Sequence, residues 1–216
     1  MVPPSSPVNA SASTPKGERR RQALVEAAAQ LLVEGGFDAV RHRAVAERAG
    51  LPLASTTYYF RDLDDLVAAA LEHHGRTELE RTRARLEAMP PGRCTLRVAA
   101  ELVLDLLLGA PREGTSSDVE AVVTRYERLV VTGRRPHLRP LSRELGLQLY
   151  ALIQQILARA GLDLDDEQIR RIVALVDGTV VNALVEVDPD PRGAARGVLW
   201  AELARQVPDG ATELGG

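Results

Sequence analysis

The sequence has few cysteine, histidine and aromatic residues and no long apolar run. Cys94 is the single cysteine, so no internal disulfide can form, which argues against a secreted fold stabilised by disulfides. The longest apolar segment, Val98 to Ala110, is interrupted by Glu101 and Asp105 and is too short to span a bilayer. The N-terminal segment lacks the apolar core of a signal peptide. We therefore expect a cytoplasmic protein without a membrane segment.

Residue combinations that support metal binding or catalysis are also scarce. The four histidines include the neighbours His73 and His74, which point in different directions on a helix, so we expect no metal and no cofactor. The acidic run at Asp165 is interpreted as a helix cap, and Cys94 as a small apolar residue. Because no phosphate-binding glycine loop and no Ser-His-Asp or Cys-His arrangement is present, an enzyme is disfavoured.

The charge of the chain is divided unevenly. Residues 16–61 contain eight Lys or Arg and five Asp or Glu, a net charge of +3, although the whole chain carries −3. The remaining residues therefore carry −6. This asymmetry favours a small basic module that approaches phosphates, attached to a larger acidic one.

Helical periodicity extends over almost the whole chain, which predicts an all-α fold of about nine helices. Gly35 and Gly36 should end the first helix, and Asp62 should cap the fourth. The fifth is apolar on nearly all sides, which predicts an enclosed position in which Asp105 needs a partner. The expected helices span 17–34, two short segments within 43–60, 62–89, 95–109, 118–132, the segment between Pro136 and Gly161, a segment from Asp165 through Leu184, and 191–207.

The segment Arg43 to Phe60 has the pattern of two short helices joined by a tight turn. Gly50 can adopt a positive φ without steric cost, and Pro52 has its φ preset for a helix start. This pattern predicts a helix-turn-helix, whose second helix lies in the DNA major groove. We divide the chain into a disordered tail at 1–15, a DNA-binding head at 16–61, a larger helical domain at 62–207 and a flexible tail at 208–216.

Four motifs occur in order along the first third of the chain: the basic run Arg19 to Arg21, GGF at Gly35 to Phe37, AVAERAG at Ala44 to Gly50, and STTYYF at Ser55 to Phe60. With these motifs the chain resembles the tetracycline-repressor-type (TetR) family of bacterial transcriptional regulators. The resemblance implies a homodimer that binds a palindromic double-stranded DNA operator. It also implies a small-molecule effector that enters the C-terminal domain and changes the separation of the two heads.

The resemblance also carries DNA-binding roles to individual positions. An arginine at Arg43 can donate two bonds to guanine, although a phosphate contact is an equal alternative. The leading end of the recognition helix would meet base edges, and the basic arm would hold phosphates. The residues concerned are Lys16, Arg19, Arg20, Arg21, His42, Arg43, Leu53, Ala54, Ser55, Thr57 and Tyr58.

Three positions depart from the family pattern. Arg41 stands where relatives have a capping Thr or Ser, Thr57 replaces a tyrosine, and Leu63 replaces a lysine that contacts the DNA backbone. These changes motivate an alternative, a helical interaction protein with a vestigial head. A third hypothesis, an all-α enzyme, has no supporting residues.

The effector site is predicted in a pocket enclosed by helices four to eight and lined chiefly by leucine and valine. Because only seven residues are aromatic, we expect an aliphatic or mixed ligand. For each polar candidate an ordinary core or surface role is the preferred alternative. The candidates are Asp105, Arg125, Tyr126, Tyr150 and Gln154.

The last two helices are both apolar along one face, which is what two identical chains need to build a four-helix interface. Completion of one chain's own core is the alternative interpretation. The predicted interface residues are Ile172, Val176, Val180, Val198, Leu199 and Leu203. We expect a repressor, although the direction of control depends on where the operator lies.

Overall fold

The computed structural model describes residues 14–110 and 118–207. Within those ranges the chain forms nine α-helices and one turn of 3-10 helix, and no strand, as the periodicity predicted. The predicted tails lie outside the described residues, apart from Thr14 and Pro15 at the first helix. The elements are α1 (Pro15–Ala39), α2 (His42–Ala49), α3 (Leu53–Tyr59), α4 (Leu63–Glu87), α5 (Leu96–Leu108), α6 (Asp118–Gly133), η1 (Pro136–Leu138), α7 (Arg139–Arg159), α8 (Asp166–Val185) and α9 (Pro191–Gln206).

Helix α1 begins two residues before the predicted start and contains the predicted break. It begins earlier because the Thr14 side chain accepts a hydrogen bond from the Gly17 amide at 3.2 Å. Gly35 and Gly36 depart from helical geometry, and Gly36 has a φ of 65°. The last turn of α1 is therefore offset from the rest, and it leads into α2.

The predicted turn between α2 and α3 is confirmed. Gly50 has a φ of 64° and a ψ of 31°, and its amide caps α2 by donating to Ala46 and Glu47. Pro52 lies just before the first residue of α3. Phe60 is buried beneath the two helices, together with Leu24 and Val45. This small core holds the helix-turn-helix against α1.

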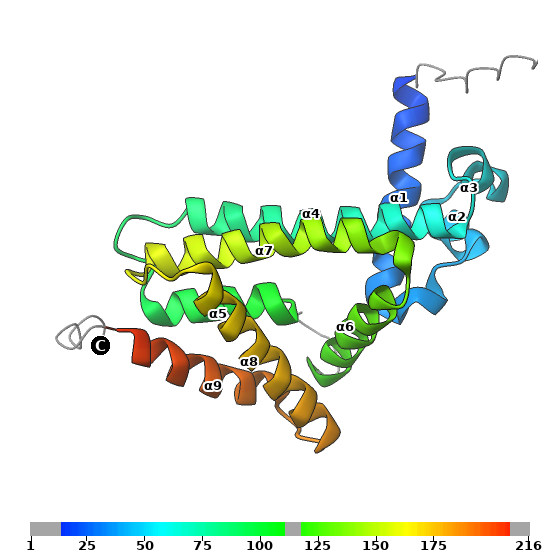
Figure 1. Cartoon of the computed structure of the whole chain (residues 1–216). Helices are drawn as coiled ribbons and strands as arrows, with labels where there is room; N and C mark the ends of the chain where they lie inside the picture. Colours follow the sequence, from blue (N-terminus) through cyan, green and yellow to red (C-terminus); the bar gives the residue numbers. More distant parts are fainter. Residues whose placement is uncertain (1–13, 111–117, 208–216) are drawn as a thin grey trace, which may run out of the picture.

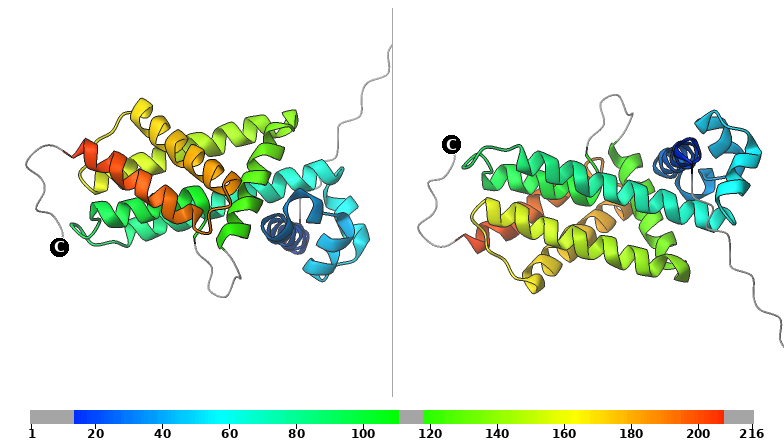
Figure 2. Two further views of the ribbon diagram at one scale, coloured as in Figure 1. Left: turned by 90° about the horizontal axis from the view of Figure 1, so that it is seen from below. Right: turned by 90° about the horizontal axis from the view of Figure 1, so that it is seen from above.

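The remaining helices form a second, larger core. Helices α4 and α7 run side by side, and α8 and α9 pack against each other (Figures 1 and 2). Helix α5 packs against both α7 and α9, and eight of its residues are buried, which confirms its enclosed position. Among the described helices, none combines the length and apolarity that a membrane crossing needs. Cys94 is buried beside α5, and burial raises the pKa of its thiol.

Polar caps and one buried carboxylate fix the ends of these helices. Asp62 caps α4, and Asp165 forms a capping box with Gln168 at α8, as predicted. Asp105 on α5 has the partners it needs, because it accepts from Arg85 on α4 at 2.8 Å and from Arg192 on α9 at 3.1 Å. These contacts tie three helices together at one point.

The burial of the predicted dimer residues contradicts the expectation that they form the interface between two chains. Five of them, all except the half-buried Val198, are at most 1% exposed and belong to the chain's own core. The apolar periodicity of α8 and α9 therefore marks the faces with which these helices pack on each other and on α5 and α7 of the same chain, and the prediction assigned these faces to a second chain. The residues buried in this way are Ile172, Val176, Val180, Leu199 and Leu203.

The burial of these residues in the chain's own core predicts different losses of stability for two matched substitutions. Leu199 has no exposed surface, whereas Leu147 on α7 is 56% exposed. We expect Leu199→Ala to lower the free energy of unfolding by about 2–5 kcal/mol, because it leaves a cavity in the core. Leu147→Ala should cost less than about 0.5 kcal/mol. Urea unfolding at low protein concentration measures both, and equal losses would contradict the assignment.

Candidate functional site

The outer face of α3 offers side chains to solvent. Leu53 is 52% exposed and Tyr58 is 77% exposed, and Ala54 and Thr57 are exposed beside them. Thr56, on the opposite face, is completely buried and its hydroxyl donates to the Leu53 carbonyl at 2.8 Å. The Tyr58 ring packs edge-on against Tyr59, with centroids 4.8 Å apart, but most of its surface stays accessible to a partner.

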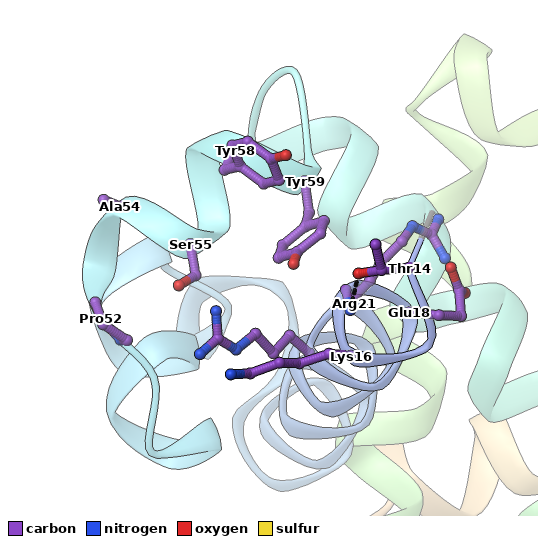
Figure 3. Close-up of a pocket in the computed structure, with 11 residues that line it drawn as sticks. Thr14, Lys16, Glu18, Arg21, Pro52, Ala54, Ser55, Tyr58 and Tyr59 are labelled. Carbon is purple, nitrogen blue, oxygen red and sulfur yellow. Dashed lines mark hydrogen bonds between the residues drawn. The ribbon is translucent and has the colours of Figure 1, made fainter. Parts of the chain in front are cut away.

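An open groove of about 1000 Å³ separates α3 from the start of α1. In Figure 3 the side chains of Lys16 from α1 and of Ser55 and Tyr59 from α3 point into this groove. Arg20 also lines it, and Arg19 is exposed nearby in sequence. Arg21 lines the groove as well, and its guanidinium lies 5.3 Å from the centre of the Phe60 ring, over the core of the head. The groove combines hydroxyl donors with cationic groups, which suits phosphate oxygens.

Helix α2 supplies one further cation. Among the described residues the Arg43 guanidinium pairs with the exposed Glu47 carboxylate, with Nε to Oε1 at 3.0 Å. Such an exposed pair contributes little, so Arg43 can turn toward another acceptor at small cost. His42 is half-buried, and its Nδ1 is buried without a hydrogen-bond partner among the described atoms.

The three departures from the family pattern leave the head intact. Arg41 makes no side-chain cap on α2 and instead donates from Nε to the Asp38 carbonyl at 3.0 Å. Thr57 donates to the Ala54 carbonyl within α3, and Leu63 packs against the core of the head. A folded helix-turn-helix therefore persists in spite of all three substitutions.

A second site, a cavity of about 200 Å³, lies between α4, α5, α6 and α7. One wall is apolar, and the other carries a cluster of charged side chains. Gly75 on α4 lies close to Leu145 on α7 in this cavity. A Cβ added at position 75 would come within 2.7 Å of the Leu145 side chain. The described lining contains no Phe, Tyr or Trp and consists of Leu71, His74, Gly75, Glu78, Leu79, Leu106, Arg125, Arg128, Leu129, Thr132, Ser142, Leu145, Gly146 and Leu149.

The charged wall is organised around Glu78. Arg125 donates from Nη1 to Glu78 at 3.1 Å and from Nη2 to the Leu106 carbonyl at 2.7 Å. His74 Nε2 lies 3.4 Å from Glu78 and 3.3 Å from Nη2 of Arg128. Burial raises the pKa of Glu78, but the nearby charges of Arg125, His74 and Arg128 outweigh burial and leave the pKa below its usual value.

Only one of the five predicted pocket residues, Arg125, lines this cavity. Asp105 is held by its two arginines, and Gln154 donates to the Leu164 carbonyl at 2.8 Å in the loop before α8. Tyr150 lies under the Arg170 guanidinium. Tyr126 donates to Asp177 on α8 at 2.8 Å, and burial raises the pKa of both groups. These four residues support packing between helices.

The sequence analysis did not assign His74, Glu78 or Arg128 to the pocket. Their helical spacing offered a signal, since His74 and Glu78 are four residues apart on α4, and Arg125 and Arg128 are three apart on α6. Each pair therefore shares one face of its helix. Spacing alone does not show that these faces of α4 and α6 meet, because their meeting depends on tertiary packing.

Comparison with known families identifies the fold and its class of function. The model described as "Bacterial regulatory proteins, tetR family" matches residues 24–70, and the one described as "Tetracyclin repressor-like, C-terminal domain" matches residues 95–205. The chain belongs to the TetR family. Because members of this family are DNA-binding transcriptional regulators, the enzyme hypothesis is excluded.

Solved TetR-family structures cover nearly the whole chain. The multidrug binding protein EbrR in complex with proflavin is 32% identical over 85% of this chain and 99% of that chain, with a TM-score of 0.59. A TetR-family member from Streptomyces coelicolor A3 is 30% identical over 85% of this chain and 97% of that chain, with a TM-score of 0.54. A protein from Saccharomonospora viridis in complex with choline shares the fold, at 22% identity over 87% and 96% of the two chains and a TM-score of 0.64.

The lowered pKa of Glu78 predicts a pH-dependent contribution to stability. The folded state favours the carboxylate, so Glu78 stabilises the fold above the ordinary glutamate pKa, and this contribution is lost as the pH falls through the lowered value. We expect Glu78→Gln to be less stable than the wild type at pH 7, with the difference shrinking toward about pH 3. Urea unfolding at several pH values measures this. Glu80→Gln, at an exposed position on α4, is the control, and a difference independent of pH would contradict the prediction.

Proposed function

We propose that the chain is a ligand-responsive transcriptional repressor that binds a palindromic operator as a homodimer and is released by a small-molecule effector. In this proposal residues 16–61 form the DNA-binding head, and residues 62–207 form the ligand-binding and dimerisation domain. The protein acts on bacterial DNA and therefore in the cytoplasm. The exposed outer face of α3, beside the cationic groove of α1, is the observation that carries the proposal.

The head supports this function through the division of α3 into two faces. Thr56 is buried and fixes the helix, whereas Leu53, Ala54, Thr57 and Tyr58 stay accessible. Leu53 and Ala54 would contact thymine methyl groups and Ser55 would bond a base edge. Thr57, Tyr58, His42 and the basic residues at the start of α1 would contact phosphates, with Arg43 reaching guanine or the backbone.

The dimer in this proposal uses the outer faces of α8 and α9. Leu175, Val181 and Val185 on α8 and Trp200 on α9 are exposed, in contrast to the buried residues one helical face away. Exposed apolar residues gathered on adjacent helices are typical of an interface. A two-fold axis through these helices would make a four-helix contact and present two heads.

The effector in this proposal enters the cavity between α4, α5, α6 and α7. The EbrR and Saccharomonospora viridis structures hold proflavin and choline, respectively, which supports small-molecule binding as a property of similar chains. The described lining here is aliphatic and charged and contains no Phe, Tyr or Trp, so an aliphatic or mixed ligand fits it best. The ligand needs only a higher affinity for the conformer that does not bind the operator.

Binding to palindromic DNA from the chain's own promoter tests the proposal. We expect the logarithm of the affinity to fall steeply with the logarithm of the salt concentration, because phosphate contacts release counterions. Arg43→Ala should cost about 1–3 kcal/mol on this DNA and relax preference at one base pair. Electrophoretic mobility shift and fluorescence anisotropy titrations measure both effects.

Arg93→Ala, an exposed arginine in the loop before α5, serves as the matched control and should leave DNA binding unchanged. Equal losses for Arg43→Ala on cognate and scrambled DNA would identify a phosphate contact. A flat salt response without sequence preference would reject the proposal and favour the helical interaction protein.

The proposed dimer face predicts the effect of a charge at Trp200. We expect Trp200→Lys to raise the dimer dissociation constant by roughly 30-fold or more, because a buried aromatic anchor is replaced by an unpaired charge. Leu147→Lys on α7 introduces the same charge at an exposed apolar position outside this face, and it should not change the dimer. Sedimentation velocity over a range of concentrations distinguishes the two variants, and an unaltered Trp200→Lys dimer would remove these helices from the interface.

A further inference from the structure

Helix α1 is interrupted between its main body and its last turn. Gly35 and Gly36 depart from helical geometry, and the φ of Gly36 is 65°. Because glycine restricts the backbone so little, two consecutive glycines do not fix the direction in which the chain continues. Helix α2 begins at His42, soon after this kink. Contacts between side chains must therefore set the direction of α2 relative to the main body of α1.

Arg48, near the end of α2, makes a forked ion pair across this kink. Its Nη1 donates to Oε1 of Glu34 at 3.0 Å, and its Nη2 donates to Oε2 of Glu34 at 2.8 Å. Nη1 also donates to Oε1 of Gln30, one turn earlier on α1, at 3.4 Å. Both acceptors precede the two glycines, so Arg48 joins the end of α2 to the main body of α1. A planar fork of this kind fixes the angle between two groups as well as their distance.

Apolar packing and the ion pair have different effects on α2. Val45 of α2 and Leu24 of α1 are completely buried in the core of the head. The hydrophobic effect depends on buried area and has no preferred direction, so it holds α2 against α1 without selecting one tilt as sharply as a hydrogen-bonded fork. The side chains of Arg48 and Glu34 are 37% and 51% exposed. Such an accessible pair contributes little to stability, and its main effect is therefore on orientation.

The tilt of α2 passes to α3 through a short, hydrogen-bonded turn. The Leu51 amide donates to the Ala46 carbonyl at 2.9 Å, and Pro52 directly precedes α3. The two helices therefore move together. Helix α2 has eight residues and is about 12 Å long, so a tilt of about 10° displaces its end by about 2 Å. That displacement breaks a hydrogen bond to a base edge, because donor–acceptor distances vary by only about 0.5 Å.

We propose that Arg48 is a positioning residue for DNA recognition, whose forked pair with Glu34 holds α2 and α3 at the angle that base contacts require. This inference rests on the proposed function, because it assigns a role within the same DNA-binding head. Neither residue lines the groove between α3 and the start of α1. Loss of the pair therefore reduces the preference for the operator over other sequences and leaves the contacts to phosphates in place.

Exchange of the two charges tests the inference. Arg48→Glu and Glu34→Arg each bring like charges together, so we expect each single variant to bind the promoter palindrome about fivefold more weakly than the wild type. The double variant restores an ion pair and should return to within about twofold of the wild type. Fluorescence anisotropy titrations of the full chain give these affinities. A loss that is confined to Arg48→Glu and persists in the double variant would identify a direct phosphate contact and overturn the inference.

The ratio of affinities for palindromic and scrambled DNA separates positioning from a general structural role. Arg48→Gln removes the pair without a clash of like charges. We expect it to weaken palindrome binding about fivefold, with unchanged binding to scrambled DNA and an unchanged salt dependence. Urea unfolding establishes that the head stays folded, and a loss of stability alone does not change the ratio while it does. An unchanged ratio, or equal losses on both DNAs, would overturn the inference.

A matched ion pair outside the head provides the control. Arg76 on α4 pairs with Glu144 on α7 at 2.8 Å, and their side chains are 42% and 51% exposed. Arg76→Gln therefore removes a similarly accessible link between two helices, and it should leave both DNA affinities within about twofold of the wild type. A loss of palindrome binding equal to that of Arg48→Gln would overturn the inference, because the effect would not depend on the position of α2.

The wild-type chain distinguishes failure of this inference from failure of the proposed function. A wild type that binds palindromic and scrambled DNA equally would reject the proposed function and the inference with it. A wild type that prefers the palindrome, together with an Arg48→Gln variant that keeps the full preference, would reject the inference alone.

Discussion

Helix α4 contributes side chains to both apolar cores of the molecule. The position of the head relative to the larger helical domain depends on this shared helix. Leu66 and Val67 near its start pack in the core of the head, whereas Leu79 and Leu86 pack in the larger core. His74, Gly75 and Glu78 of the cavity lie on the same 25-residue helix, and the first two fall between these two sets. Because α4 enters both cores as one continuous helix, we expect a displacement of α4 at the cavity to reach Leu66 and Val67 in the head.

A second contact reinforces this connection. The Arg135 guanidinium, after α6, lies 4.2 Å from the centre of the Phe37 ring in the last turn of α1. Helix α6 also carries Arg125 and Arg128 of the cavity. Two of the helices that line the cavity, α4 and α6, therefore also connect to the head. Two packed contacts of this kind favour discrete positions of the head over a continuous range.

Local features of the fold were predictable because their causes lie within a few residues. Gly50 requires no partner beyond its own turn to adopt a positive φ, and Asp62 and Asp165 cap amides three residues away. The fold class and the enclosed α5 followed from periodicity alone. The early start of α1 was missed because the cap at Thr14 was not considered.

Contacts between distant residues account for what sequence reasoning could not supply. Arg192 is 87 residues from Asp105, and Arg125 is 47 residues from Glu78, so neither pairing follows from spacing. Apolar periodicity located the buried faces of α8 and α9 but could not say that helices of the same chain cover them. The DNA-binding positions stay predictions, and the structure adds the division of α3 into a buried and an exposed face.

The spacing of the two heads tests the central claim most directly. A nitroxide at Glu26→Cys, an exposed position on α1, reports this spacing, since the buried Cys94 reacts poorly. With the operator bound, pulsed electron paramagnetic resonance should give one narrow distance distribution, consistent with recognition helices one DNA turn, about 34 Å, apart. The absence of a paired distance, or a distribution that the operator leaves unchanged and that is incompatible with this spacing, would contradict the account.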